Sequence, residues 1–152
     1  MLDYLNHLHN AFLVVRVPRN DLKGKRILEI GEKLYFNDLG LRHALSGYKS
    51  NDISQIFENI VLNDLFIKGY DVSIGKIGAK EIDFVCDKAD NRVYIQVTLS
   101  LADEKVKERE IGNLLMINDN FRKIIVTGDE YNQEMIKGIE IWNIRRFLAE
   151  FS

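Results

Sequence analysis

The sequence predicts an α/β fold, and three observations support this. First, the chain has 152 residues, of which 46% are hydrophobic and 29% are charged, which is the composition of one ordinary globular domain with a small appendage. Second, from Asp52 onward the hydrophobic periodicity follows the order α-β-β-β-α-β. Third, the segment before Asp52 has the pattern of a helix followed by a β-hairpin. We therefore expect an α/β core with a helix and a hairpin in front of it.

The N-terminal segment contains several short elements. Leu2, Leu5 and Leu8 recur at helical spacing, directly after the first residue. A strand is expected after this helix, and Pro18 indicates that the strand ends in a turn. The turn continues through the Gly-containing run that follows Pro18. The predicted order begins with a strand (residues 11–17), a turn (18–25) and a returning strand (26–30). A further short strand (33–36) and a short helix ended by glycine (39–47) follow.

The strongest helix signal begins at Asp52. Asp52 is a suitable N-cap, and Gln55 lies three residues later in the capping-box position. Gly69 is expected to end the helix. One apolar stripe runs along it, formed by Ile53, Ile56, Phe57, Ile60, Val61 and Leu65.

The rest of the chain alternates between strands and helices. Strands are predicted over residues 70–76, 80–87, 92–98, 122–127 and 139–142, and helices over residues 101–118 and 143–151. A tight turn, K-A-D-N, joins the second and third of these strands. No apolar run approaches the roughly 20 residues that a membrane span requires, and the N-terminus lacks a signal-peptide layout. Cys86 is the single cysteine, which excludes a disulfide framework and favours a reducing, cytoplasmic location.

The turn fixes the expected register of the two strands that it joins. If it centres on Ala89 and Asp90, Asp83 lies opposite Gln96. Alternation then gives one polar face and one apolar face. The polar face contains Glu81, Asp83, Val85, Tyr94, Gln96 and Thr98, and the apolar face contains Ile82, Phe84, Val93, Ile95 and Val97. The apolar face is expected to pack on a helix; the polar face is either a site or a plain solvent-facing surface.

The polar face resembles a metal-dependent nuclease site. Such sites place an acid on one strand and an acid-x-lysine pair on the next, so that a divalent cation and an attacking water lie beside a phosphate. Here Asp83 supplies the first acid, Gln96 is an amide at the second acid position, and Thr98 occupies the lysine position. Glu58, on the helix that begins at Asp52, adds a second carboxylate, either at the edge of the apolar stripe or directed at a positive group. Weak magnesium binding by Asp83, Glu58 and Gln96 is compatible with this set.

Hydrolysis also needs a positive group beside the metal, and Thr98 cannot supply it. The nearby cations that could replace the missing lysine are Lys76, Lys80, Lys105 and Lys107. Surface charge is the alternative role for each of them. The degenerate pattern therefore favours an inherited scaffold over a working catalyst.

Three segments of the chain resemble a known family: F-E-N-I-V-L-N-D-L, G-K-I-G-A-K-E-I-D-F-V and Y-I-Q-V-T-L-S-L. They are similar to the C-terminal domain of unknown function of bacterial and archaeal AAA-type ATPases. The resemblance implies a restriction-endonuclease-like domain over residues 49–152 and a winged-helix remnant with linking elements over residues 1–48. It places Glu58 at the position of the helix glutamate of the nuclease pattern and Asp83 at that of the strand acid. Gln96 then stands at the second acid position and Thr98 at the lysine position.

The resemblance implies a nuclease-like, noncatalytic module that serves an ATPase module of the same longer protein in DNA binding or partner recognition. ATP would bind only to that other module, because the chain has no G-x-x-x-x-G-K-[ST] pattern. Two alternatives stay open. One is an active magnesium-dependent DNA endonuclease with a relocated lysine, and the other is a protein interaction module.

A local basic cluster is the candidate DNA-binding surface. The net charge of −2 excludes a global basic field, so a nucleic-acid contact has to be local. Residues 16–26 contain a single acid and five cations. The cations are Arg16, Arg19, Lys23, Lys25 and Arg26. On a hairpin wing these side chains would contact phosphates. The alternative is a solvated turn.

Overall fold

The computed structural model describes residues 2–24, 26–47, 49, 52–130 and 135–152. Its helices are α1 (Leu2–Asn10), α2 (Leu39–Ser46), α3 (Ile53–Ile67), α4 (Glu104–Leu115) and α5 (Ile144–Glu150). Its strands are β1 (Val14–Asp21), β2 (Arg26–Phe36), β3 (Asp71–Ile77), β4 (Lys80–Lys88), β5 (Asn91–Thr98), β6 (Arg122–Thr127), β7 (Met135–Ile136) and β8 (Ile139–Asn143). Within the described residues the strands form one eight-stranded sheet in the order β2-β1-β3-β4-β5-β6-β8-β7. The predicted α/β class is confirmed.

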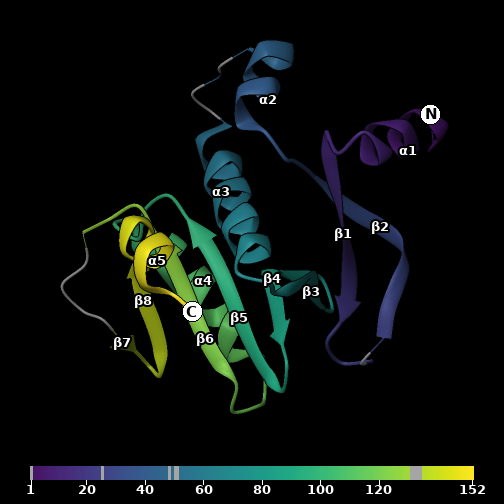
Figure 1. Ribbon diagram of the computed structural model, residues 1–152. Coiled ribbons are helices and arrows are strands. Elements are labelled where there is room, and N and C mark those ends of the chain that lie inside the picture. Colours follow the sequence, from purple (N-terminus) through teal and green to yellow (C-terminus); the bar gives the residue numbers. More distant parts are fainter. Residues whose placement is uncertain (1, 25, 48, 50–51, 131–134) are drawn as a thin grey trace.

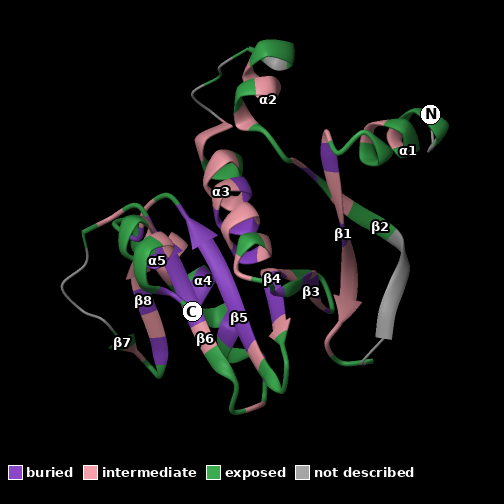
Figure 2. Cartoon of the chain, viewed as in Figure 1, coloured by how far each residue is buried: buried purple, intermediate pink, exposed green. Residues whose placement is uncertain are grey.

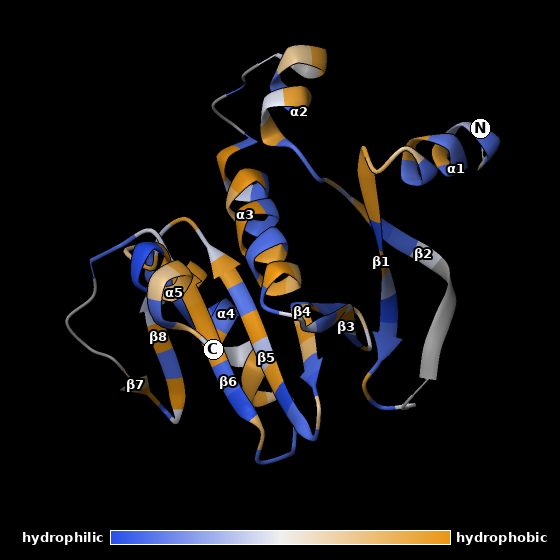
Figure 3. Cartoon of the chain, viewed as in Figure 1, coloured by the Kyte–Doolittle hydropathy of each residue, from blue (hydrophilic) through white to orange (hydrophobic). Residues whose placement is uncertain are grey.

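Helices cover both faces of the central strands (Figure 1). On one face, α3 and α5 pack on alternate residues of β4, β5 and β6, and on the other face α4 packs on the residues between them. Figure 2 shows that the buried positions concentrate in β5 and its neighbours, and Figure 3 shows that hydrophobic residues follow the same strands. Two apolar clusters therefore sandwich the sheet, and polar side chains between them need partners inside the protein.

The N-terminal segment is a helix followed by a β-hairpin, as the sequence predicts, and it joins the main sheet. β1 pairs with β2 antiparallel and with β3 parallel, through Arg19–Asp21 and Ile74–Lys76. The predicted turn at Pro18 is wrong, because Pro18 lies within β1 at a register shift between Val17 and Arg19. A proline cannot donate a ladder hydrogen bond, so a bulge tolerates it. The two strands expected on the return side are one strand, β2.

Helix α3 begins after Asp52, but the predicted capping box is absent. Asp52 is the N-cap residue without a side-chain capping bond. Its carboxylate instead accepts a hydrogen bond from Arg42 Nη2 at 2.8 Å, which ties α2 to the start of α3. At the other end, Gly69 has φ +80°, a left-handed conformation that suits glycine after a helix.

The predicted register of β4 and β5 is confirmed from Phe84–Ile95 to Lys88–Asn91, with Ala89 in the turn at φ 51°. The face assignment is wrong for Ile82, which packs with Val85 in the α4 cluster instead of with Phe84. A register shift between Ser73 and Gly75 of the neighbouring β3 accompanies this change. The solvent-facing alternative for the polar face is also wrong, because its members Val85, Tyr94, Gln96 and Thr98 are buried.

The C-terminal elements agree with the sequence in type and differ at their ends. The helix predicted over residues 101–118 is α4, and it is shorter at both ends. The two-residue strand β7 was not predicted, since two residues carry no periodicity. No helix among the described residues is long and apolar enough to cross a membrane.

Candidate functional site

The four residues that the sequence singled out line one pocket. It has a volume of about 270 Å³ and lies between α3 and α4, beside the strands β4 and β5. Glu58 comes from α3, Asp83 from β4, and Gln96 and Thr98 from β5. The convergence expected from the strand register is therefore present. The other lining residues are Ser54, Glu81, Val97, Arg109, Glu110 and Asn113.

At this pocket, side chains replace the backbone ladder between β4 and β5. The backbone pairing reaches Phe84–Ile95. Beyond it, the Asp83 N–H donates to Gln96 Oε1 at 2.6 Å, and the Val97 N–H donates to Asp83 Oδ2 at 2.8 Å. The strands diverge, and two side chains bridge the gap. Buried backbone groups need a hydrogen-bond partner. These two bonds therefore hold the two strands together and also fix the side chains of the site.

Gln96 continues this network to α4. It is 3% exposed, and its Nε2 donates to Glu110 Oε2 at 2.7 Å. Glu110 is 6% exposed, and its other oxygen accepts from Arg109 Nη2 at 2.6 Å and Nε at 3.0 Å. Glu110 is not among the residues that the sequence pattern predicts for the site. The available signal was its spacing of four residues from Leu114, which puts both on one side of α4.

Glu58 is directed at a positive group and is not only a boundary residue of the stripe. Lys33 Nζ, from β2, donates to Glu58 Oε2 at 2.7 Å, and the Tyr35 hydroxyl donates to the same oxygen at 3.2 Å. Lys33 is therefore the cation that contacts Glu58, and Arg109 is the cation that lines the pocket itself. None of the four lysines proposed from the sequence lines the pocket. Nothing local in the sequence marks Lys33, because a tertiary contact between β2 and α3 brings it to Glu58.

The electrostatics reflect this crowding of carboxylates. The pKa of Asp83 is raised to about 7, chiefly by burial and then by the nearby Glu58 carboxylate, whereas the Val97 N–H and Lys33 act in the opposite direction. Burial, followed by the Glu58 charge, also raises the pKa of Tyr35, so its hydroxyl stays protonated. The site therefore favours additional positive charge or a proton on Asp83.

The arrangement leaves two carboxylate oxygens for a divalent cation. Asp83 Oδ1 and Glu58 Oε1 accept no hydrogen bond from the described part of the chain. Gln96 Oε1 already accepts from the Asp83 backbone, and the Thr98 hydroxyl donates to Ser100 O at 3.3 Å. Among the described residues, no group of three or more His, Cys, Asp or Glu side chains has the arrangement of a metal site. Asp83 and Glu58 would be the contacts of a bound ion.

The basic cluster of the hairpin is divided by ion pairs. Arg16 lies 3.7 Å from Glu32, and Arg19 donates to Glu81 at 3.0 Å. Lys23 is exposed. Lys25 lies outside the described residues, and only the backbone of Arg26 is described. Over the described residues, the basic cluster is therefore not a continuous surface of unpaired cations.

Comparison with known proteins gives one similar sequence. The chain is 41% identical over 138 residues to an uncharacterized protein of Haemophilus influenzae (strain Rd), a match that covers 91% of this chain and 34% of that protein. The chain thus spans about a third of the length of this relative. No family model matches the chain. No solved structure matches it either.

Proposed function

We propose that the chain is a noncatalytic, nuclease-like module of a AAA-type ATPase, with a restriction-endonuclease-like core that binds the DNA backbone. Glu58, Asp83, Gln96 and Thr98 are the positions of the former site, and their convergence in one pocket supports this origin. The chain carries no nucleotide-binding loop, so ATP would be bound by another part of the protein. Two thirds of the Haemophilus relative lies outside the match, which leaves room for such a module there.

The bonding of Gln96 carries the noncatalytic part of the proposal. Its amide donates to the Glu110 carboxylate at 2.7 Å and accepts from the Asp83 backbone at 2.6 Å. A carboxylate at this position would have no N–H to donate to Glu110, and the two negative charges would repel each other. The amide is thus adapted to its neighbours. A second metal-binding acid at position 96 would conflict with the network that holds β4, β5 and α4 together.

DNA binding is supported by the hairpin, although its cations are paired. The Arg16 and Arg19 side chains keep 23% and 21% of their surface exposed, and the partner acids are more exposed still. The two carboxylates, Glu32 and Glu81, are 43% and 36% exposed, so a phosphate could approach the arginines from the same side. Lys23 adds an exposed cation on the same hairpin. A few such contacts give salt-sensitive, sequence-independent affinity.

One observation favours a second candidate function, an active magnesium-dependent nuclease. The Lys33 ammonium lies 2.7 Å from Glu58 and so supplies the positive group that Thr98 lacks. Asp83 Oδ1 and Glu58 Oε1 remain for a cation, and magnesium commonly uses one or two carboxylates with waters and substrate phosphate. In this function Lys33 would orient the attacking water or offset phosphate charge.

A cleavage and binding assay separates the two functions. Purified protein is incubated with supercoiled and linear DNA in magnesium or manganese, and binding is measured in parallel as a function of salt. The proposal predicts no metal-dependent cleavage, with binding that survives Asp83→Asn and weakens with Arg16→Gln. Metal-dependent cleavage that disappears in both Asp83→Asn and Lys33→Met would establish the nuclease instead.

Lys105→Gln is the matched control for the charge substitutions, because Lys105 is exposed on α4 and does not line the pocket. It should leave binding and cleavage unchanged. Absence of DNA binding at low salt, together with capture of a defined protein partner, would favour the interaction-module alternative and end the DNA proposal.

A further inference from the structure

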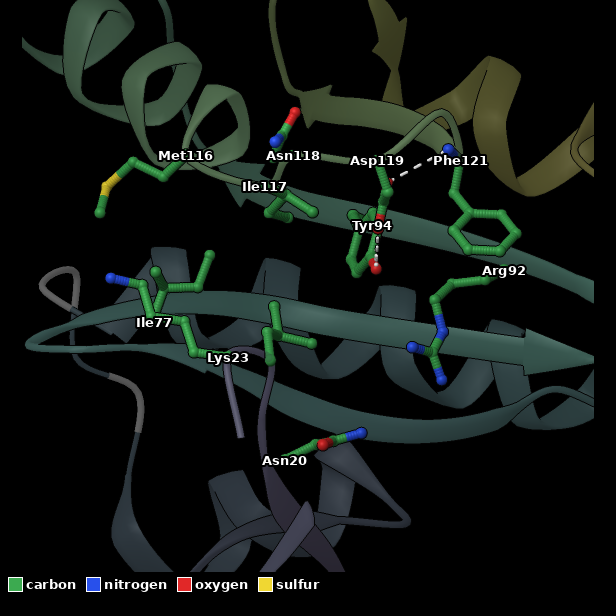
Figure 4. A pocket seen from close by; sticks show the side chains of 11 residues that line it. Asn20, Lys23, Ile77, Arg92, Tyr94, Met116, Ile117, Asn118, Asp119 and Phe121 are labelled. Carbon is green, nitrogen blue, oxygen red and sulfur yellow. Dashed lines mark hydrogen bonds between the residues drawn. The ribbon is translucent and has the colours of Figure 1, made fainter. Parts of the chain in front are cut away.

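A second and larger pocket lies on the α4 side of the sheet. It has a volume of about 560 Å³, within the range of small-molecule sites, and it shares no lining residue with the candidate site. The ends of β1 and β3, the start of β5 and the loop after α4 form its walls. Figure 4 shows Met116, Asn118 and Phe121 along one wall and Lys23, Ile77 and Arg92 along the other.

Charge-assisted bonds hold two of the walls in place. Arg92 makes a two-bond fork to Asp87, with both distances 2.7 Å. Tyr94 donates to Asp119 at 2.7 Å, and the Phe121 N–H donates to the other Asp119 oxygen at 3.2 Å. Such bonds are directional, so they fix the side chains before any ligand arrives. The pocket is preformed, and binding would require little ordering.

The two ends of the pocket differ in chemistry (Figure 4). At one end the Phe121 ring, 45% exposed, and the Arg92 side chain lie on opposite walls of the pocket. A planar cation and an aromatic ring are both good partners for a ligand ring. At the other end Lys23 extends beside Met116, and no acidic side chain of the described residues lies within ion-pair distance of its ammonium. The apolar side chains Leu22, Ile77 and Ile117 line the space between.

We propose that this pocket binds a small organic anion with an aromatic body. The ring lies between Phe121 and Arg92, and the anionic group, a carboxylate or a phosphate, meets Lys23. The Asp119 carboxylate already accepts hydrogen bonds from Tyr94, the Phe121 N–H and Lys123. These bonds reduce its repulsion of an anionic ligand. The site shares no lining residue with the nuclease-like pocket, and it shares Lys23 with the DNA-binding proposal.

The test is an amide-resolved NMR titration with matched probes. Indole-3-acetate carries both the ring and the charge, whereas indole and acetate each carry one of them. Adenosine monophosphate replaces the carboxylate with a phosphate and so distinguishes the two anion sources. We expect shifts at residues 20–23, 92–94 and 116–121 and at least fivefold tighter binding of indole-3-acetate or adenosine monophosphate than of indole or acetate.

Variants locate the two contacts. Lys23→Gln and Phe121→Ala should each weaken the tighter probe at least fivefold, and both side chains are exposed enough for the fold to persist. The matched control, Lys105→Gln, should leave binding unchanged. Indole that binds as tightly as indole-3-acetate, shifts confined to other surfaces, or equal affinity in Lys23→Gln would each overturn the proposal.

Discussion

The two regions that the sequence marked for function, the β4–β5 pocket and the β1–β2 hairpin, differ in how their charges are held. In the pocket, Glu110 is almost fully buried, and Glu58, Asp83 and Glu110 are each tied to a neighbour by a short hydrogen bond. On the hairpin, Arg16 and Arg19 form partly exposed pairs, and the partner of Arg19, Glu81, lies at the rim of the pocket. Burial makes the pocket network costly to change, and exposure makes the hairpin pairs exchangeable. The pocket network therefore resists substitution, and the hairpin pairs can change partners at lower cost.

The largest effect is expected for Gln96→Leu, which would break the link between the strands and α4. The substitution leaves the Asp83 N–H and Glu110 Oε2 without their present partners, while Glu110 Oε1 keeps its bonds from Arg109. Each unsatisfied buried group costs about 1–3 kcal/mol, so the free energy of unfolding should fall by about 2–6 kcal/mol. Urea denaturation measures this change.

Gln55→Leu is the matched control, since Gln55 is exposed on α3. It should change the free energy of unfolding by less than about 0.5 kcal/mol. If both substitutions have the same small effect, the amide of Gln96 is not the structural link that the noncatalytic proposal requires.

The difference between the regions also explains what the sequence could predict. Asp83 and Gln96 were placed together because a tight turn fixes register over a few residues, and the Glu58 helix was recognised from its apolar stripe. Lys33 could not be found, because its contact with Glu58 joins residues 25 apart across separate elements. Ile82 was assigned to the wrong face because strict alternation does not anticipate the irregular register beside β3.

A second prediction concerns the pH dependence of stability and is specific to the pocket. The pKa of Asp83 is raised to about 7 in the folded state from its ordinary value of 3.8, so between these values the folded protein binds the proton more tightly than the unfolded chain. The free energy of unfolding should therefore decrease as pH rises from about 4 to 7, by up to about 1.4 kcal/mol per pH unit from this group.

Asp83→Asn removes this titration and keeps an oxygen that can accept from the Val97 N–H. Its stability should thus vary less with pH than that of the unchanged protein, measured by urea denaturation at intervals from pH 4 to 8. Asp90→Asn, on the exposed turn, is the control and should leave the slope as it is. Parallel curves for the Asp83→Asn variant and the unchanged protein would show that the pocket does not crowd its carboxylates as described.

The smallest effect is expected on the hairpin, for Arg19→Gln. The Arg19 and Glu81 side chains are 21% and 36% exposed, so losing their bond should lower the free energy of unfolding by only about 0.5 kcal/mol. If Arg19 exchanges Glu81 for a DNA phosphate, the same substitution should reduce the salt dependence of DNA binding by about one counterion. Arg145→Gln, on the exposed surface of α5, is the matched control. A large loss of stability with an unchanged salt slope would mean that the hairpin pair is structural after all, and the contrast between the two regions would disappear.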